Sequence, residues 1–314
     1  MRKWIPGVIV MVVAALALPV AAAEKVQLRL NVKEGMRRGV RITADHTITQ
    51  TVQQTHHVAR QKVETDYTYE VVKVEANGNA MVRTTYKTVR FMQEGPMGKV
   101  EYDSSRHVGP VPLPARPLAS LPGASFLMTM SPEGEVLGVE GVGALLKKML
   151  DSLELPPGAQ SDVVRRSIEE QFGDEAIKEM MGKTMFVYSR EPVSVGDSWG
   201  QTSVIRRVMP MIVQNTLTLK GREKGVARLD VNGTIKPNPE GTGMVIAGMR
   251  VLYELRGAQA GTVEVEEATG WPVRSRVGQR VAGEMKIGGQ PGAPVVNIPV
   301  VMEGVVALET IAPD

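Results

Sequence analysis

Residues 39–52, with the sequence GVRITADHTITQTV, alternate between apolar and polar side chains. The apolar set is Val40, Ile42, Ala44, Ile48 and Val52, and the residues between them are Arg41, Thr43, Asp45, Thr47, Thr49 and Thr51. Successive side chains of a β-strand point to opposite faces, so this pattern predicts a strand with one face in a core and the other in water. Two polar residues, His46 and Gln50, fall on the apolar face.

The neighbouring segments continue the same two-residue period. Val26–Val32 alternates in the same way and predicts a strand before the first one. Val63–Tyr69 also alternates, and Val71–Val74 then shifts the phase, which predicts a β-bulge. The dipeptide Asn77-Gly78 marks a hairpin turn before a further strand. The N-terminal part of the chain is therefore expected to be β throughout.

The same alternation returns after Phe186 and continues to the C-terminus. One predicted strand has Met211, Val213, Leu217 and Leu219 on a single face. Val245–Leu255 predicts another strand, and Val296–Leu308 predicts the last one. Long strands with one apolar face must bury that face, so these strands are expected to share an apolar core.

The middle of the chain has a different pattern. Five prolines between Gly109 and Pro122 predict an extended connector, because proline removes backbone donors. A hairpin is expected over Phe126–Val139. Apolar residues then recur at three- and four-residue steps from Val142 to Leu153, which predicts an amphipathic helix. A second helix is expected over Val164–Phe172, and a third short one is expected from an Asp174 cap to Gly182.

These patterns predict a mainly β protein with a central helical segment, of the α+β class. We expect two long-stranded antiparallel curved sheets or half-barrels, covered by two to three helices. The predicted division is an N-terminal β half at residues 24–118, a hairpin plus helical segment at 119–184, and a C-terminal β half at 185–314. Val72–Val82 aligns without gaps on Leu219–Leu229, which suggests a pseudo-repeat of the two halves. The alternative is that two hairpins with glycine turns simply look alike.

The first 23 residues have the features of a cleaved signal peptide. Arg2 and Lys3 precede an apolar stretch from Ile5 to Leu18, and Ala21–Ala23 supplies small residues for a peptidase. The alternative is a retained membrane anchor, although the apolar stretch is shorter than the roughly 20 residues of a spanning helix. We expect a periplasmic or secreted protein with no transmembrane segment after signal cleavage.

The composition argues against several classes of function. The 314 residues include no cysteine, which excludes disulfides, thiolate catalysis and iron–sulfur ligation. The 37 basic and 34 acidic residues nearly balance, so nucleic acid is not an expected partner. His56 and His57 point to opposite faces of a strand, and no metal site is expected. The glycine-rich loop at 288–294 precedes a strand, so it lacks the helix N-terminus of a phosphate site. We expect no cofactor.

Catalytic motifs are not found in the sequence. It has no Gly-x-Ser-x-Gly elbow, no Walker-type loop and no dinucleotide fingerprint after a strand. We therefore expect no catalytic residues and a protein that is not an enzyme. A hydrolase assembled from residues distant in sequence is the less favoured alternative.

Methionine is the one unusual feature of the composition, with 18 Met against four Phe. Methionine-rich surfaces adapt to variable apolar ligands, although gap filling in a core is their commoner role. The polar positions His46 and Gln50 would then fix a ligand's head group. For His46 the alternative is a core histidine with a satisfied hydrogen bond. The residues expected to line a ligand site are His46, Gln50, Leu145, Met149 and Met211.

The sequence also resembles a family of exported bacterial proteins of unknown function. The resemblance rests mainly on Glu191–Trp199, with the sequence EPVSVGDSW, and on Ala268–Pro272, with the sequence ATGWP. It extends over nearly the whole chain after residue 23. The family implies no reaction, so no catalytic residue is carried over. More loosely, an open β-barrel with a helical lid resembles the periplasmic lipoprotein-carrier fold.

We therefore expect a non-enzymatic protein of the cell envelope that binds an apolar or lipid-like ligand in a β half-barrel covered by helices. The alternative is a periplasmic interaction or scaffold module that joins an envelope protein through exposed sheet edges and holds no small ligand.

Overall fold

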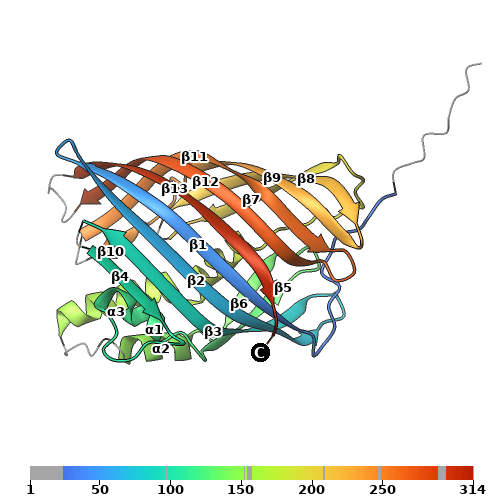
Figure 1. Ribbon diagram of the computed structural model, residues 1–314, viewed down its shortest axis with the longest axis horizontal. Helices are drawn as coiled ribbons and strands as arrows, with labels where there is room; N and C mark the ends of the chain where they lie inside the picture. Colours follow the sequence, from blue (N-terminus) through green and yellow to red (C-terminus); the bar gives the residue numbers. More distant parts are fainter. Residues whose placement is uncertain are drawn as a thin grey trace, which may run out of the picture.

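A computed structural model describes residues 24–96, 98–151, 153, 158–207, 209–246, 249–288 and 295–313 of the protein (Figure 1). The predicted signal peptide at residues 1–23 lies outside the described residues, as do residues 289–294 of the glycine-rich loop.

The described residues form thirteen strands in a single sheet. Their bounds are β1 (Arg37–Val52), β2 (Thr55–Val74), β3 (Ala80–Gly95), β4 (Gly98–Asp103), β5 (Ser125–Met130), β6 (Val136–Glu140), β7 (Ser198–Ile205), β8 (Met211–Glu223), β9 (Val226–Pro237), β10 (Met244–Ile246), β11 (Met249–Glu266), β12 (Trp271–Gly288) and β13 (Val296–Ile311). The helices are a 3₁₀ turn (Leu113–Ala115), α1 (Arg116–Ala119), α2 (Gly143–Asp151), α3 (Ala159–Phe172) and α4 (Asp174–Thr184). The protein is therefore mainly β with a helical middle, as predicted.

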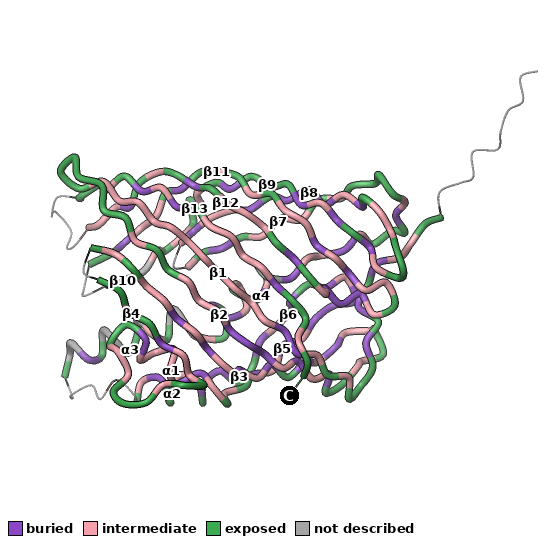
Figure 2. Tube along the Cα trace, in the orientation of Figure 1, coloured by how far each residue is buried: buried purple, intermediate pink, exposed green. Residues whose placement is uncertain are grey.

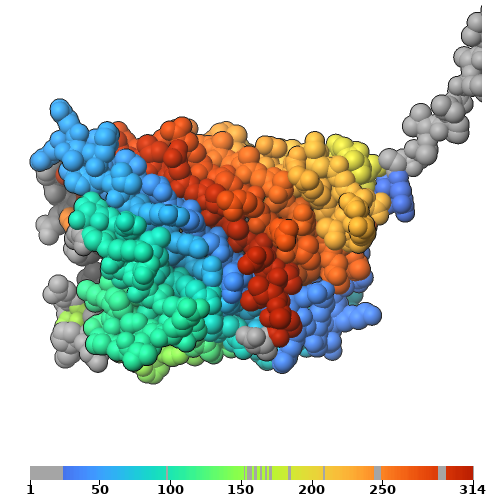
Figure 3. Space-filling model, in the orientation of Figure 1, coloured from blue at the N-terminus to red at the C-terminus, as the bar shows by residue number. Residues whose placement is uncertain are grey.

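The expectation of two separate sheets is wrong. The strand order is β6-β5-β3-β2-β1-β13-β12-β11-β9-β8-β7, with β4 added to β3 and β10 added to β11. The two halves join because β1 pairs antiparallel with β13, from Gly39 opposite Ile311 to Gln50 opposite Val300. Figure 3 shows this junction as a band of C-terminal residues beside the N-terminal strands. The pairing satisfies the edges of both halves, which would otherwise carry unpaired backbone groups.

The alternation in each strand separates an inward face from an outward face. On β1, Val40, Ile42 and Ile48 point inward and pack on core clusters, while Arg41 and Asp45 form ion pairs on the outward face. The sheet curls, so that β1, β2 and β13 lie in front of β7 and β8 in Figure 1. The apolar faces of both halves consequently line one interior.

The buried apolar residues form three main clusters. The first core cluster joins the N-terminal half to the helices, and it includes Tyr67, Tyr69, Tyr86, Phe126, Leu145, Met149, Ile177, Met181 and Trp271. The second core cluster includes Leu28, Leu217, Leu219, Leu229, Val231 and Val263. The third core cluster includes Ile205, Val213, Ile235, Leu255, Val281, Met285, Val300 and Met302. The strands of the C-terminal half thus place most of their buried apolar residues in the second and third core clusters, while Trp271 of β12 and Leu308 of β13 belong to the first.

The helices lie close to their predicted positions. The stripe of α2 contributes Leu145 and Met149 to the first core cluster, and α4 contributes Ile177 and Met181. α4 contacts both edge strands of the sheet, β6 and β7. Asp174 is the first residue of α4, while the N-cap position belongs to Gly173, so the expected aspartate cap is wrong.

Two predicted strands differ in the structure. Val26–Val32 has only an isolated bridge from Val26 to Val193, because its backbone turns to hydrogen-bond Pro132 and Thr269 instead of a continuous partner. Its alternate residues are still buried, with Leu28 in the second core cluster and Leu30 in the first. The expected strand Val245–Leu255 is two strands, since β10 folds back antiparallel on β11.

The pseudo-repeat stays a prediction. The β2–β3 and β8–β9 hairpins each have a shift of pairing register near the turn, at Val71/Lys73 and at Leu219/Gly221. A bulge close to a hairpin turn is common enough that this likeness alone does not establish duplication.

Candidate functional site

One row of inward residues across the sheet is polar where the rows beside it are apolar. The row follows the pairing register through nine strands, from β3 to β7. We call it the polar row, and its members in spatial order are Gln93, Gln61, His46, Gly304, Gln279, Gln259, Gly233, Asn215 and Gln201.

The two flanking inward rows make the contrast clear. On one side the residues in register are Phe91, Val63, Ala44, Val306, Val277, Gly261, Val231, Leu217 and Trp199. On the other side they are Ala59, Ile48, Met302, Val281, Gly257, Ile235, Val213 and Ser203. Apart from Ser203 and the indole N–H of Trp199, the flanking positions carry no polar side-chain group. The polar row is therefore a belt of hydrogen-bonding groups between apolar surfaces.

Two hydrogen bonds run along the polar row, and each passes over a glycine. The Gln279 amide donates to His46 Nε2 at 2.8 Å across Gly304, and the Gln259 amide donates to Asn215 Oδ1 at 2.8 Å across Gly233. A Cβ atom on Gly304 would meet the His46 ring, and one on Gly233 would meet Asn215 Oδ1. Glycine at these two positions therefore leaves the space through which the side chains reach each other.

Gln201 ends the polar row at the edge strand β7. Its amide nitrogen donates to the Met185 carbonyl at 3.3 Å, and its Oε1 accepts from the Val187 backbone N–H at 3.4 Å. Trp199 on the same strand donates from Nε1 to the Val187 carbonyl at 2.8 Å. The row thus connects the sheet to the segment that follows α4.

His46 is neutral in this arrangement. An amide nitrogen can only donate, so His46 must accept through Nε2 and carry its proton on Nδ1. Burial lowers the pKa of His46 below its ordinary value, and the nearby Asp45 carboxylate opposes this effect only in part. Asp45 itself points outward and pairs with Arg60 at 2.7 Å.

The interior is less tightly closed along the polar row than in the core clusters. His46, Ile48, Val277, Gln279 and Val306 point inward and are only partly buried. By contrast, Leu217, Val231 and Val263 of the second core cluster are 0% exposed. Figure 2 shows this difference in burial, because the middle of β1 is coloured as intermediate and not as buried. The inward residues between the first and third core clusters are therefore less buried than those inside the clusters.

The structure distributes the five predicted ligand-lining residues over three places. His46 lies in the polar row, and Gln50, four residues further along β1, places its Nε2 4.0 Å from Met285 Sδ. Met211 packs against the third core cluster. Leu145 and Met149 are buried in the first core cluster. His46, Gln50 and Met211 thus share the inward face near the third core cluster, and the two α2 residues do not join them.

The other hydrogen-bonded members of the polar row were missing from the sequence-based prediction. Gln279, Gln259 and Asn215 each stand alone among the apolar residues of their own strands. The available signal was the interruption itself, because Asn215 falls on the face shared by Val213 and Leu217. Only the pairing register shows that these interruptions align.

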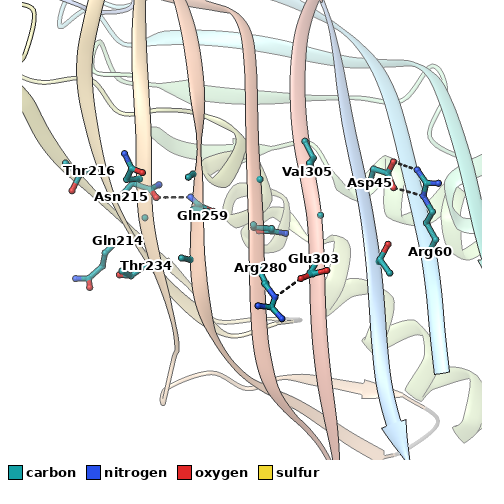
Figure 4. A pocket seen from close by; sticks show the side chains of 18 residues that line it. Asp45, Arg60, Gln214, Asn215, Thr216, Thr234, Gln259, Arg280, Glu303 and Val305 are labelled. Carbon is teal, nitrogen blue, oxygen red and sulfur yellow. Dashed lines mark hydrogen bonds and ion pairs between the residues drawn. The ribbon is translucent and has the colours of Figure 1, made fainter. Parts of the chain in front are cut away.

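The outward side of the sheet is hollowed along the same row (Figure 4). The hollow has a volume of about 1100 Å³ and is open to solvent. Outward side chains line it together with members of the polar row, including Asn215, Gln259 and Gln279. Two ion pairs lie in it, between Asp45 and Arg60 at 2.7 Å and between Arg280 and Glu303 at 2.6 Å. Figure 4 shows both pairs together with the Asn215–Gln259 hydrogen bond. Charged groups therefore lie on the face opposite the inward surface.

The other histidines lie apart from the polar row. His56 Nδ1 hydrogen-bonds Thr51 Oγ1 at 3.0 Å, and His107 Nε2 hydrogen-bonds the Pro110 carbonyl at 3.1 Å. Within the described ranges, no group of three His, Cys, Asp or Glu side chains is placed to hold a metal ion. A search of the same residues finds no helix that is long and apolar enough to span a membrane.

Comparison with solved structures gives matches with low sequence identity. A structure of lipid–protein interactions in lipovitellin matches 89% of this chain with a TM-score of 0.48 and 9% identity. This chain spans about a quarter of that protein, since the match covers 25% of its length. An outer membrane channel from Pseudomonas putida F1 matches 90% of this chain and 97% of its own, with a TM-score of 0.25 and 8% identity.

No curated protein matches the chain. One family model does match, over residues 77–272, and it is described as a family of unknown function (DUF6263). The match covers more than half of the chain, including the helical middle and the strands from β3 to β11. The predicted resemblance to a family of unknown function is confirmed, and the chain belongs to this family.

Proposed function

We propose that the protein is a non-catalytic binding protein of the cell envelope that holds an apolar molecule inside its curved sheet. The observation that carries this proposal is the partly buried inward surface between the first and third core clusters. Burying the apolar surface of a ligand there would remove both the ligand and the sheet from water.

The apolar part of the ligand would contact the rows that flank the polar row. Ile48 lies on one side of the polar row, and Ala44, Val306 and Val277 lie on the other, and all four are only partly buried. Met285 and Met302 belong to the third core cluster. Methionine side chains are flexible and polarizable, so they can adapt to chains of different shape.

The polar row would hold the polar end of the ligand. Pockets for small molecules commonly combine an apolar lining with a few placed polar groups that fix orientation. His46, Gln279, Gln259 and Asn215 supply such groups within an otherwise apolar surface.

The side chains of the polar row are better suited to binding a ligand than to catalysing a reaction. The one titratable side chain, His46, hydrogen-bonds an amide instead of a nucleophile. General-base catalysis requires the histidine to contact the group whose proton it removes. The envelope location is supported by the positively charged, apolar start of the sequence.

The proposal is tested on protein purified from the envelope of its own host. Native mass spectrometry, followed by extraction with organic solvent, is expected to show a bound apolar molecule that is released on denaturation. A mass equal to that of the bare chain, with no lipid in the extract, would overturn the proposal. A stable protein companion without any small molecule would favour a scaffold role instead.

A matched pair of variants tests whether the ligand binds on the inward face of the sheet. Ala44→Trp puts a large side chain on the inward surface beside the polar row, whereas Thr43→Trp puts the same side chain on the outward face of the same strand. We expect Ala44→Trp to lose the bound molecule and Thr43→Trp to keep it. Circular dichroism confirms that both variants fold. Equal retention by both folded variants would contradict an interior site.

A further inference from the structure

We infer that the polar row selects a ligand whose polar group is uncharged, such as an alcohol, an amide or an ester, over the same chain bearing a carboxylate or an ammonium group. This inference rests on the proposed function, because it assumes that an apolar molecule enters the sheet.

The side chains of the polar row are all neutral. Its polar members are six carboxamides and His46, and the Gln279 hydrogen bond requires the imidazole to be uncharged. A carboxamide has both donors and an acceptor, so it can satisfy a hydroxyl, an ester or an amide. No member of the row supplies the opposite charge that an ionised head group needs.

The inward strand positions around the row also lack charge. Along β9, β12 and β13, and along β8 and β11 up to their bulges at Leu219 and Glu264, the inward residues are apolar, glycine or uncharged polar. On β1 the same holds from Val40 to Val52, while Arg38 is paired with Glu266 at 2.6 Å near the end of the sheet. A charged head group moved from water to this surface would lose hydration without gaining a counter-ion.

The nearest charges are already paired on the outward face. Asp45 binds Arg60, and Arg280 binds Glu303, next to row members on the same strands. Side chains that alternate along a strand project to opposite faces, so these groups cannot turn to meet a ligand inside. The sheet therefore separates a charged exterior from an uncharged interior at the same level.

The test compares three probes that share one chain, namely oleyl alcohol, oleate and oleylamine, near neutral pH. Their affinities are measured by displacement of a fluorescent fatty alcohol from the purified protein. We expect oleyl alcohol to bind at least about tenfold more tightly than either ion, because burial of an unpaired charge costs more than the loss of one hydrogen bond. Equal or tighter binding of oleate or oleylamine would overturn the inference and leave the proposed function intact. Failure of all three probes to bind would overturn both.

A charged substitution in the polar row tests whether the row selects the ligand's head group or only supports the fold. Gln279→Glu is expected to remove most of the preference for oleyl alcohol over oleylamine, so that oleylamine gains about tenfold relative to oleyl alcohol. The control is Gln214→Glu, which places the same charge on the outward neighbour of Asn215. The control is expected to keep the preference of the unmodified protein. An unchanged preference in folded Gln279→Glu protein would contradict the inference.

Discussion

The first core cluster and the polar row share several strands, yet the first is fully buried and the second is mostly only partly buried. In the first core cluster, Tyr67, Tyr69 and Trp271 are at most 6% exposed, and the rings of Tyr69 and Trp271 lie 5.5 Å apart. Further along the same sheet, glycines and carboxamides replace the aromatic residues. Both regions are thus built on the same alternation of inward and outward residues. They differ in the size of the inward residues, and larger inward side chains give the more completely buried interior.

The largest expected effect lies in the filled region. Trp271→Ala removes a side chain that is 2% exposed and should lower the free energy of unfolding by about 3–5 kcal/mol, because it leaves a cavity. Urea denaturation measures the change.

Tyr69→Phe is the matched control in the same cluster. The Tyr69 hydroxyl is buried without a hydrogen-bond partner among the described residues, so its removal should leave stability unchanged or raise it by about 1 kcal/mol. A large loss in Tyr69→Phe would mean that the hydroxyl has a partner, and a small loss in Trp271→Ala would show that this region is loosely packed.

A smaller effect is expected where the polar row depends on glycine. Gly304→Ala would place a Cβ atom 2.6 Å from the Asp45 carbonyl oxygen and against the His46 ring. We expect a loss of about 1–3 kcal/mol in unfolding free energy from this overpacking. Gly278→Ala is the control, because its Cβ atom would meet nothing closer than 3.8 Å and should change stability by less than about 0.5 kcal/mol. Equal losses of unfolding free energy in the two variants would show that the polar row does not depend on the absence of a side chain at Gly304.

His46 makes the partly open region sensitive to pH. Burial lowers the pKa of His46 in the folded protein, so the unfolded chain takes up the proton first as the pH falls. Stability is therefore fully present above the ordinary histidine pKa of about 6.5 and decreases as the pH falls toward the folded value. Urea midpoints at about pH 8 and pH 5 should differ more for the unmodified protein than for His46→Gln. Equal differences would show that His46 does not couple to folding.

The smallest effect is expected on the outward face. Arg280 and Glu303 form an ion pair at 2.6 Å, but their side chains are 72% and 57% exposed. Exposed pairs contribute little because water and salt screen them, so Arg280→Ala should lower stability by no more than about 0.5 kcal/mol. A loss above about 1 kcal/mol in the same denaturation assay would show that the two faces differ less than the structure indicates.

Much of the local structure was predictable from the sequence, because period and turn chemistry are local properties. The faces of β1, the Asn77-Gly78 turn and the stripe of α2 follow directly from residue spacing. The pairing of β1 with β13 was not predictable, since any two amphipathic strands are compatible by their alternation alone. The strand predicted at Val26–Val32 was wrong for a related reason. Burial of alternate residues does not by itself require that the backbone pair with a neighbouring strand.

The candidate site was predictable only in part. The inward position of His46 follows from its place between Ala44 and Ile48. Its partner Gln279 lies 233 residues away, and only the register across β13 brings the two side chains together. A row of this kind is a property of the whole sheet, so no single strand reveals it.

The pairing of β1 with β13 also affects how the protein is made. β1 emerges early during synthesis, and one of its edges has no native partner until the last strand of the chain has been translated. A nascent chain in this state carries an exposed strand edge with a strong tendency to aggregate. Closing a contact between segments so far apart in the sequence is slow, so this pairing is expected to form late in folding.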